Sequence, residues 1–448
     1  MIKKIVSSEA LYVSLFWIAY MFLCLHFYVE RSTYADNSYY LFEIIQHKDF
    51  CIQYNRYSAV LTQWLPVLAV KCQLPLNMVM YAYSLSPVLL FLLLFLFIRY
   101  MCQQKYIAYI FLFSLILTVH DSFFYVNDEL NQSVGFLLVM TSILKAEKWN
   151  NAIRFSLILM LIFILQFAHL FLLLAALVLL VVSYMERRQA ISLMSIVFVV
   201  LLILARATIF KTGRDGSSMD SLDWHVLTLR NIHSSPFALF TREMIWKYYL
   251  PAIVLIVLLC RNIQTKIWSK MALIFGVCGM YLLLVIFLIH GASAIYLDKY
   301  LAVLFLLLWS YIAFNLITIS KNKNAIFGLI LLVNLISFSS LYIEKTYSHR
   351  VEYLKVLMAK GTNKQIVLYE NMPPDIQTMS WSVPYETLLI STLNGESKTI
   401  LVKESFYKIE EYLTDSTAFL GAEWTFPQQT KLNEYYFTLK NGLYEYKP

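Results

Sequence analysis

The stretch from residue 153 to residue 184, IRFSLILMLIFILQFAHLFLLLAALVLLVVSY, decides the fold class of this chain. It is almost wholly apolar, and it is too long for one crossing, because a helix needs only about 20 residues to span a hydrocarbon core of about 30 Å. Basic residues flank it on both sides, among them Lys148 and Arg187. Since basic flanks favour the same side of a membrane, the run predicts two antiparallel spans that meet near His169.

The composition of the whole chain points the same way. Of 448 residues, 60% are hydrophobic and 14% are charged, whereas about a quarter are charged in an average soluble protein. A spanning segment must satisfy its own backbone polar groups, so the spans are helices. We therefore predict an α-helical polytopic membrane protein with about eleven transmembrane helices, near residues 10–29, 78–98, 106–119, 132–144, 153–168, 169–184, 190–208, 249–260, 271–289, 300–319 and 325–343.

Lys and Arg in short loops indicate which side is cytoplasmic. With a cytoplasmic N-terminus every inside loop is short and basic, as at Arg99, Lys145, Arg188 and Lys321. The excess of 36 basic over 28 acidic residues is therefore a topology signal, and we do not expect nucleic-acid binding. We expect a multi-pass protein of the cytoplasmic membrane, in contact with membrane lipids. Its outer loops are residues 30–77, 120–131, 206–248 and 290–299.

Near residue 345 the apolar runs give way to mixed charge, Pro and strand-like patterns. We predict a transmembrane domain over residues 1–344 and a small soluble α/β domain over residues 345–448, on the outer face. KQIVLYEN and KTILVKES read as short buried strands, and SFYKIEEYL reads as an amphipathic helix. The segment YYFTLKNGLYEY reads as a hairpin with a type I′ turn at Asn441-Gly442.

The first outer loop is long and amphipathic. Apolar and aromatic residues recur at helical spacing from Tyr39 to Ile45 and again from Val60 to Leu68, which predicts two helices that lie in the membrane interface. The polar turn HKDFCIQYNRY separates them. Asp36 lies where the chain leaves the first span.

The order of these features resembles the first outer loop of the GT-C membrane glycosyltransferases, in the aminoarabinose transferase and protein O-mannosyltransferase branches. The shared features are an acid soon after the first span, in Asp-x-x-Tyr-Tyr from Asp36, then an interfacial helix, a polar turn, a basic residue at Arg56 and a second helix that contains Trp64. The chain departs from the pattern in two places: Asn37 replaces the usual second acid, and Arg56-Tyr57-Ser58 replaces Lys-Pro-Pro.

The resemblance implies an enzyme that transfers a sugar from a polyprenyl-phosphate-linked donor to a lipid, glycan or protein acceptor on the outer, periplasmic face. A carboxylate that accepts the proton of the attacking hydroxyl contributes about 10²- to 10⁴-fold in rate, and Asp36 is the candidate for that base. The carrier phosphate gains negative charge as the sugar leaves, which favours a fixed cation. Arg56 is the first candidate, followed by Lys299 and Arg206.

The second outer loop, VHDSFFYVNDELNQS, contains further acids. In the resembling family an acid of this loop lines the site and, in some branches, binds a divalent metal. Asp121 and Glu129 are therefore further catalytic candidates and, with Asp36, candidate ligands for a divalent cation such as Mg²⁺ or Mn²⁺. Alternatively, Asp128 and Glu129 cap the helix that follows.

Other candidates carry similar alternatives. His169 and His290 are polar residues at the outer ends of spans and could contact the donor phosphate. Asp36 could instead pair with Arg31 or Arg56, and Arg56 could extend toward lipid headgroups. Trp381 could stack on a sugar ring, although a core role is the simpler interpretation.

The sequence contains no Walker motif, no G-x-G-x-x-G, no H-E-x-x-H and no G-x-S-x-G. Two other classes remain open. An O-antigen-type glycan polymerase or ligase would use the Arg residues of the 206–248 loop. A non-enzymatic transporter of lipid-linked glycans would need charges near mid-membrane, whereas the ionisable residues here gather at the outer surface.

Overall fold

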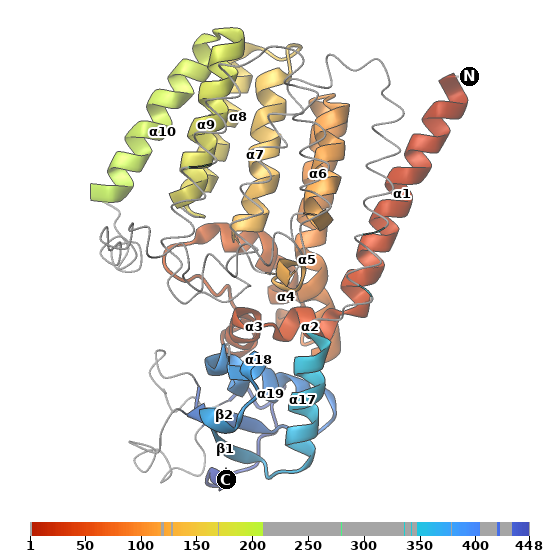
Figure 1. Ribbon diagram of the computed structural model, residues 1–448, viewed down its shortest axis with the longest axis vertical. Coiled ribbons are helices and arrows are strands. Elements are labelled where there is room, and N and C mark those ends of the chain that lie inside the picture. Colours follow the sequence, from red (N-terminus) through yellow and green to blue (C-terminus); the bar gives the residue numbers. More distant parts are fainter. Residues whose placement is uncertain are drawn as a thin grey trace.

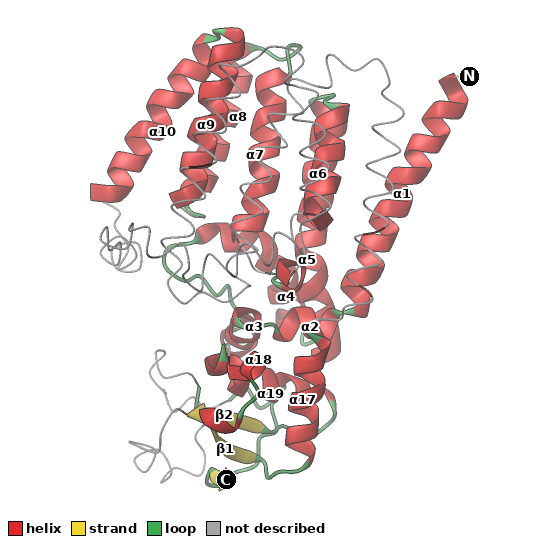
Figure 2. Cartoon of the chain, in the orientation of Figure 1, coloured by secondary structure: helices red, strands yellow, loops and turns green. Residues whose placement is uncertain are grey.

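The computed structural model describes residues 2–117, 121–126, 129–168, 170–208, 347–377, 379–403, 419–421 and 432–447, and three single residues at 279, 336 and 342. This part of the chain is largely helical and has a small parallel sheet near its C-terminus (Figure 2). The four spans predicted after residue 248, most of the 206–248 loop and the helix predicted at residues 405–413 lie outside the described residues.

Each span predicted within the described residues falls on a helix. The run that decided the fold class is divided as expected, because α8 ends at Gln166 and α9 begins at Leu170. In α5 the chain continues beyond Leu96 as one π-helical stretch, η2. These helices are α1 (Ile2–His26), α5 (Leu76–Leu96), η2 (Phe97–Met101), α6 (Lys105–Leu117), α7 (Glu129–Lys145), α8 (Asn151–Gln166), α9 (Leu170–Arg187) and α10 (Ala190–Thr208).

By length and composition, one stretch of the described residues, Leu76–Met101, is long and apolar enough to cross a membrane. Five shorter helical stretches are apolar too. They are Ala10–His26, Gln132–Lys145, Asn151–Gln166, Leu172–Met185 and Ala190–Arg206.

Figure 1 shows α6 to α10 side by side, with the N-terminus and the α7–α8 connection at one end of the bundle. Short helices lie across the other end, and the C-terminal unit lies beyond them. The two predicted interfacial helices are present as α3 and α4. The short elements at this end are α2 (Tyr28–Thr33), α3 (Asp36–His47), η1 (Tyr57–Ala59), α4 (Val60–Lys71) and η3 (Asp121–Phe124).

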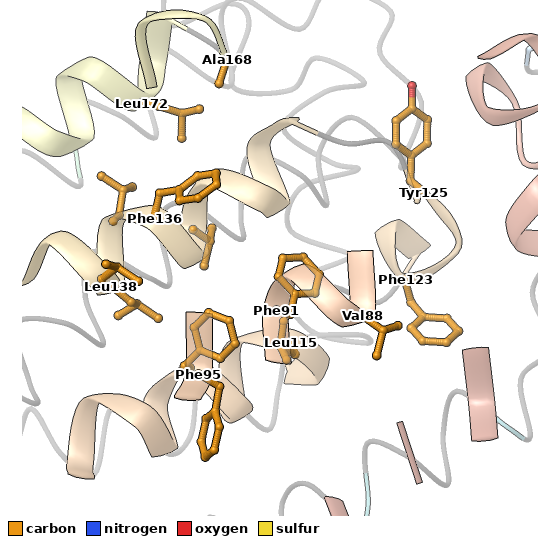
Figure 3. Packing of buried hydrophobic residues seen from close by; sticks show 14 of the residues in the cluster. Val88, Phe91, Phe95, Leu115, Phe123, Tyr125, Phe136, Leu138, Ala168 and Leu172 are labelled. Atoms are coloured by element: carbon orange, nitrogen blue, oxygen red, sulfur yellow. The ribbon is translucent and has the colours of Figure 1, made fainter. Parts of the chain in front are cut away.

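The bundle has an aromatic-rich core, part of which Figure 3 shows around Phe91, Phe95 and Phe136. The helices pack closely at Gly135, where a Cβ atom would lie 2.8 Å from Leu94 Cδ1. Large apolar side chains also cover the outer surface. Examples are Leu11, Leu15, Ile18 and Phe22 on α1, Leu93 on α5, Phe163 on α8, and Val197, Leu201 and Leu204 on α10.

The C-terminal unit contains a three-stranded sheet in the order β2-β1-β3, with both pairs parallel. The two predicted strands are β1 and β2. The unit consists of α17 (Ser348–Ala359), β1 (Lys364–Leu368), η6 (Tyr369–Asn371), α18 (Pro374–Gln377), η7 (Ser380–Ser382), α19 (Val383–Leu393), β2 (Thr399–Lys403) and β3 (Glu445–Lys447).

The predicted C-terminal hairpin is wrong. Residues 445–447 pair in parallel with β1, and residues 437–444 form no strand. Asn441 and Gly442 also lack the positive φ that a type I′ turn requires. The segment before it binds α3 through Asn433: the side chain donates to the Ile45 carbonyl at 2.8 Å, and the backbone N–H donates to Gln46 at 2.9 Å.

Candidate functional site

Asp36 is the first residue of α3 and is half-buried. The residue before it, Ala35, has φ 43° and ψ −118°. An L-residue rarely adopts a positive φ, and such a conformation costs about 1–3 kcal/mol, which the surrounding contacts must offset. The candidate base therefore follows directly on a strained turn.

Two side chains join the segment after α1 to residues 121–126. Arg31, which is buried, donates to the backbone carbonyl of Phe123, and its Nε donates to Ser84 Oγ at 2.9 Å. Asn37 Nδ2 donates to the Phe124 carbonyl at 2.8 Å. Phe123 and Phe124 belong to η3, which begins at Asp121. The backbone that carries Asp121 thus lies against the turn that carries Asp36.

Asn37 also explains one departure from the glycosyltransferase pattern. Its Nδ2 donates a second hydrogen bond, to the Arg31 carbonyl at 2.7 Å, and its Oδ1 accepts one from Tyr83 at 3.4 Å. The side chain is fully buried. A carboxylate cannot donate to two carbonyl groups, so an amide satisfies this position and an ionised acid would not.

Arg56 lies at the end of the polar turn, partly exposed, with its guanidinium carbon 6.0 Å from the centre of the Tyr54 ring. The turn is fixed to α4 by the buried Gln63. Its Oε1 accepts from the Cys51 N–H at 2.8 Å, and its Nε2 donates to the Cys51 carbonyl at 2.9 Å. This pairing fixes the turn that carries Arg56 at the α3 end of the bundle.

The connection between α8 and α9 reaches the same end. The Ser58 N–H donates to the Phe167 carbonyl at 3.4 Å, and the Tyr57 and Phe167 rings meet edge to face at 5.5 Å. Arg206 is buried and donates to the Gln166 carbonyl at 2.5 Å. Arg206 therefore contributes to helix packing beside the candidate site.

Three buried polar oxygens near this point have no hydrogen-bond partner among the described residues. They are Ser58 Oγ, Gln132 Oε1 and Gln166 Oε1. Gln132 also donates to Thr62 Oγ1 at 2.7 Å, which brings α7 to α4. An unsatisfied buried acceptor costs about 1–3 kcal/mol, so such groups suit an ordered water. Gln166 was not predicted from the sequence, although it stands out there as a polar residue within an apolar run.

A carboxyl group that the sequence reasoning missed lies further along α3. Burial raises the pKa of Glu43, and His47, whose Nε2 is 3.3 Å from Glu43 Oε2, partly opposes that shift. Burial and the neighbouring Glu43 also raise the pKa of Tyr39. Residues 36, 39, 43 and 47 follow helical spacing, so these groups extend along the helix from Asp36.

Of the remaining predicted site residues, the structure describes some and not others. Asp121 begins η3 and Glu129 begins α7, which suits the capping alternative for Glu129. His169, His290 and Lys299 lie outside the described residues. Within the described part of the chain, no group of three or more His, Cys, Asp and Glu residues could hold a metal ion.

Comparison of the chain with protein-family profiles, with curated proteins and with solved structures gives no significant match.

Proposed function

We propose that this chain is a membrane glycosyltransferase of GT-C type, which transfers a sugar from a polyprenyl-phosphate-linked donor to a hydroxyl-bearing acceptor on the outer side of the membrane. The observation that carries the proposal is the contact of the two acid-bearing outer loops, through Arg31 and Asn37 with the carbonyls of Phe123 and Phe124. It brings together, at one end of a helical bundle, two segments that are distant in the sequence. A reaction at the membrane surface requires such an arrangement.

The distribution of apolar side chains supports a membrane location. The helices carry apolar residues both in the core and on their outer surfaces, as at Ile18 and Leu201. A helix that is apolar all round suits the lipid phase or a large buried core. With four further apolar runs after residue 248, the sequence favours the bilayer.

The chemistry assigns one role to each of two outer-loop groups. The acceptor oxygen forms a bond to the anomeric carbon while the bond from that carbon to the phosphate oxygen breaks. Asp36 takes the acceptor's proton, and the electron pair of the broken bond goes to the carrier phosphate. Arg56 neutralises the phosphate, since a guanidinium presents paired N–H donors.

Asp121 and Glu129 are kept as further candidates for proton transfer.

The test measures polyprenyl-phosphate binding and glycosyl transfer on the same purified samples. Asp36→Asn is expected to bind the lipid phosphate normally and to lose transfer by about 10²- to 10⁴-fold, the range for a general base. Arg56→Ala is expected to weaken lipid-phosphate binding. Asp49→Asn, an exposed acid in the same loop, and Arg188→Gln, an exposed base at the far end of the bundle, are the matched controls.

Wild-type binding and transfer in both Asp36→Asn and Arg56→Ala would contradict the proposal. Loss of activity only on substitution of Arg214, Arg230 or Arg242 would instead favour a polymerase or ligase. Movement of intact lipid-linked glycan without transfer would favour a transporter.

A further inference from the structure

The hydroxyl of Tyr347 bridges the two sides of the strained turn before Asp36. It donates to the Thr33 carbonyl at 2.8 Å and accepts from the Ala35 N–H at 3.2 Å. Tyr347 is buried, and its ring packs on Tyr34, with ring centres 4.4 Å apart. One phenol therefore holds the backbone on either side of residue 34.

We propose that Tyr347 is a positioning residue: it holds the Ala35 N–H while Ser38 Oγ holds the Ala35 carbonyl, and together they fix the φ and ψ of Ala35 and thereby the direction of the Asp36 side chain. This inference rests on the proposed function, since it concerns the placement of the candidate base. Ala35 precedes the first residue of α3, and the Ala35 carbonyl accepts from Ser38 Oγ at 2.7 Å. A change in φ or ψ at Ala35 would rotate the start of α3 relative to η3.

Tyr347 itself is fixed by the C-terminal unit. Arg350, in the first turn of α17, places its guanidinium carbon 5.8 Å from the centre of the Tyr347 ring. Arg350 is held by Glu386 through two bonds of 2.8 Å, from Nε and from one terminal nitrogen. Ser382 donates to the same carboxylate. Since Arg350 and Glu386 are buried, the ion pair is a rigid support rather than a solvated surface contact.

A second contact fixes the start of α17 to the same region. Ser348 Oγ donates to Glu30 Oε1 at 2.8 Å, and Glu30 lies five residues before Ala35. Burial and the nearby Glu386 raise the pKa of Tyr347 well above its ordinary value, so the hydroxyl keeps the proton that it donates to Thr33. The C-terminal unit thus acts on the candidate base through one neutral phenol.

The experiment uses the full chain and the variants Tyr347→Phe, Ala35→Gly, their combination, and Tyr436→Phe as the matched control. Tyr436 is in the same unit, and its hydroxyl has no partner among the described residues. Two quantities are measured: kcat and KM for the lipid-linked donor, and hydrogen exchange of residues 33–38.

Tyr347→Phe is expected to lower kcat by about 10- to 100-fold with little change in KM, because misplacement by about 1 Å has effects of that order. Exchange of residues 33–38 is expected to accelerate, and Tyr436→Phe is expected to match the wild type. Glycine adopts positive φ without a Cβ penalty, so Ala35→Gly in the Tyr347→Phe background is expected to restore part of kcat.

Hydrogen exchange of residues 33–38 at the wild-type rate in Tyr347→Phe would overturn the bridge, whatever the role of Asp36. Faster exchange in Tyr347→Phe, together with wild-type transfer by Asp36→Asn, would refute the base and this positioning role while leaving the bridge intact. Loss of kcat with exchange raised throughout the chain, and no rescue by glycine, would show a general effect on folding and would also overturn the inference.

Discussion

Asn37 stands where the resembling glycosyltransferases have a second acid, and its contacts account for the difference. Its amide donates to the carbonyls of Arg31 and Phe124, both inside the protein. Two buried carbonyls require a donor, and an amide provides it. The departure that the sequence leaves unexplained is therefore a structural requirement of the loop–loop contact.

Asn37→Asp is expected to destabilise the chain by about 1–3 kcal/mol or more, because an ionised carboxylate would face two carbonyl oxygens in a buried site. The loss should shrink as the pH falls, since a protonated carboxyl can again donate one hydrogen bond. Thermal unfolding of the variant and the wild type between about pH 3 and pH 8 checks this, a range that begins below the ordinary aspartate pKa of about 3.9. Equal unfolding temperatures at pH 8 would contradict the assigned contact.

At the scale of single residues, the sequence indicates candidate residues but not the contacts that they make. It singles out Asp36 and Arg56 by their position in the loop, but it gives no sign that Tyr347, more than 300 positions away, binds the backbone beside Asp36. Nor does periodicity reveal that Arg31 donates to a distant carbonyl. Such contacts depend on tertiary packing, which local patterns do not contain.

Among the elements, helix positions were predicted well because apolar runs and basic breaks determine them. The break between α8 and α9 and the two short helices α3 and α4 are examples. The C-terminal hairpin failed because a local turn motif at Asn441-Gly442 was overridden by parallel pairing with β1. A local turn preference is outweighed where the chain can pair with the edge of a neighbouring strand.

The polar turn before α4 depends on one side chain, Gln63. Gln63→Leu is expected to remove two hydrogen bonds and to leave the half-buried Cys51 N–H and carbonyl without these partners, at up to about 1–3 kcal/mol for each group. Because the turn ends at Arg56, we also expect weaker binding of polyprenyl phosphate. Thermal unfolding and lipid binding measure the two effects, and Asp49→Asn controls for a change in the same turn. Unchanged lipid binding in a destabilised Gln63→Leu would separate the turn from the phosphate site.

At the scale of the whole molecule, the connections divide between two ends of the bundle. The α7–α8 connection lies with the N-terminus, whereas α3 and the C-terminal unit lie at the opposite end (Figure 1). Basic residues in short loops predicted this division, since charge bias and helix count together determine which loops share a side.

If the bundle crosses a membrane, the two ends face different compartments. In a background without native cysteines, His47→Cys and Glu396→Cys are expected to react with a membrane-impermeant maleimide added outside intact cells, because both positions are exposed at the α3 and C-terminal end. Glu147→Cys, exposed in the α7–α8 connection, is expected to react only after the membrane is permeabilised. Labelling of all three positions in intact cells would contradict a spanning bundle. Labelling of Glu147→Cys alone would keep the bundle but reverse its orientation, and would place Asp36 on the cytoplasmic side.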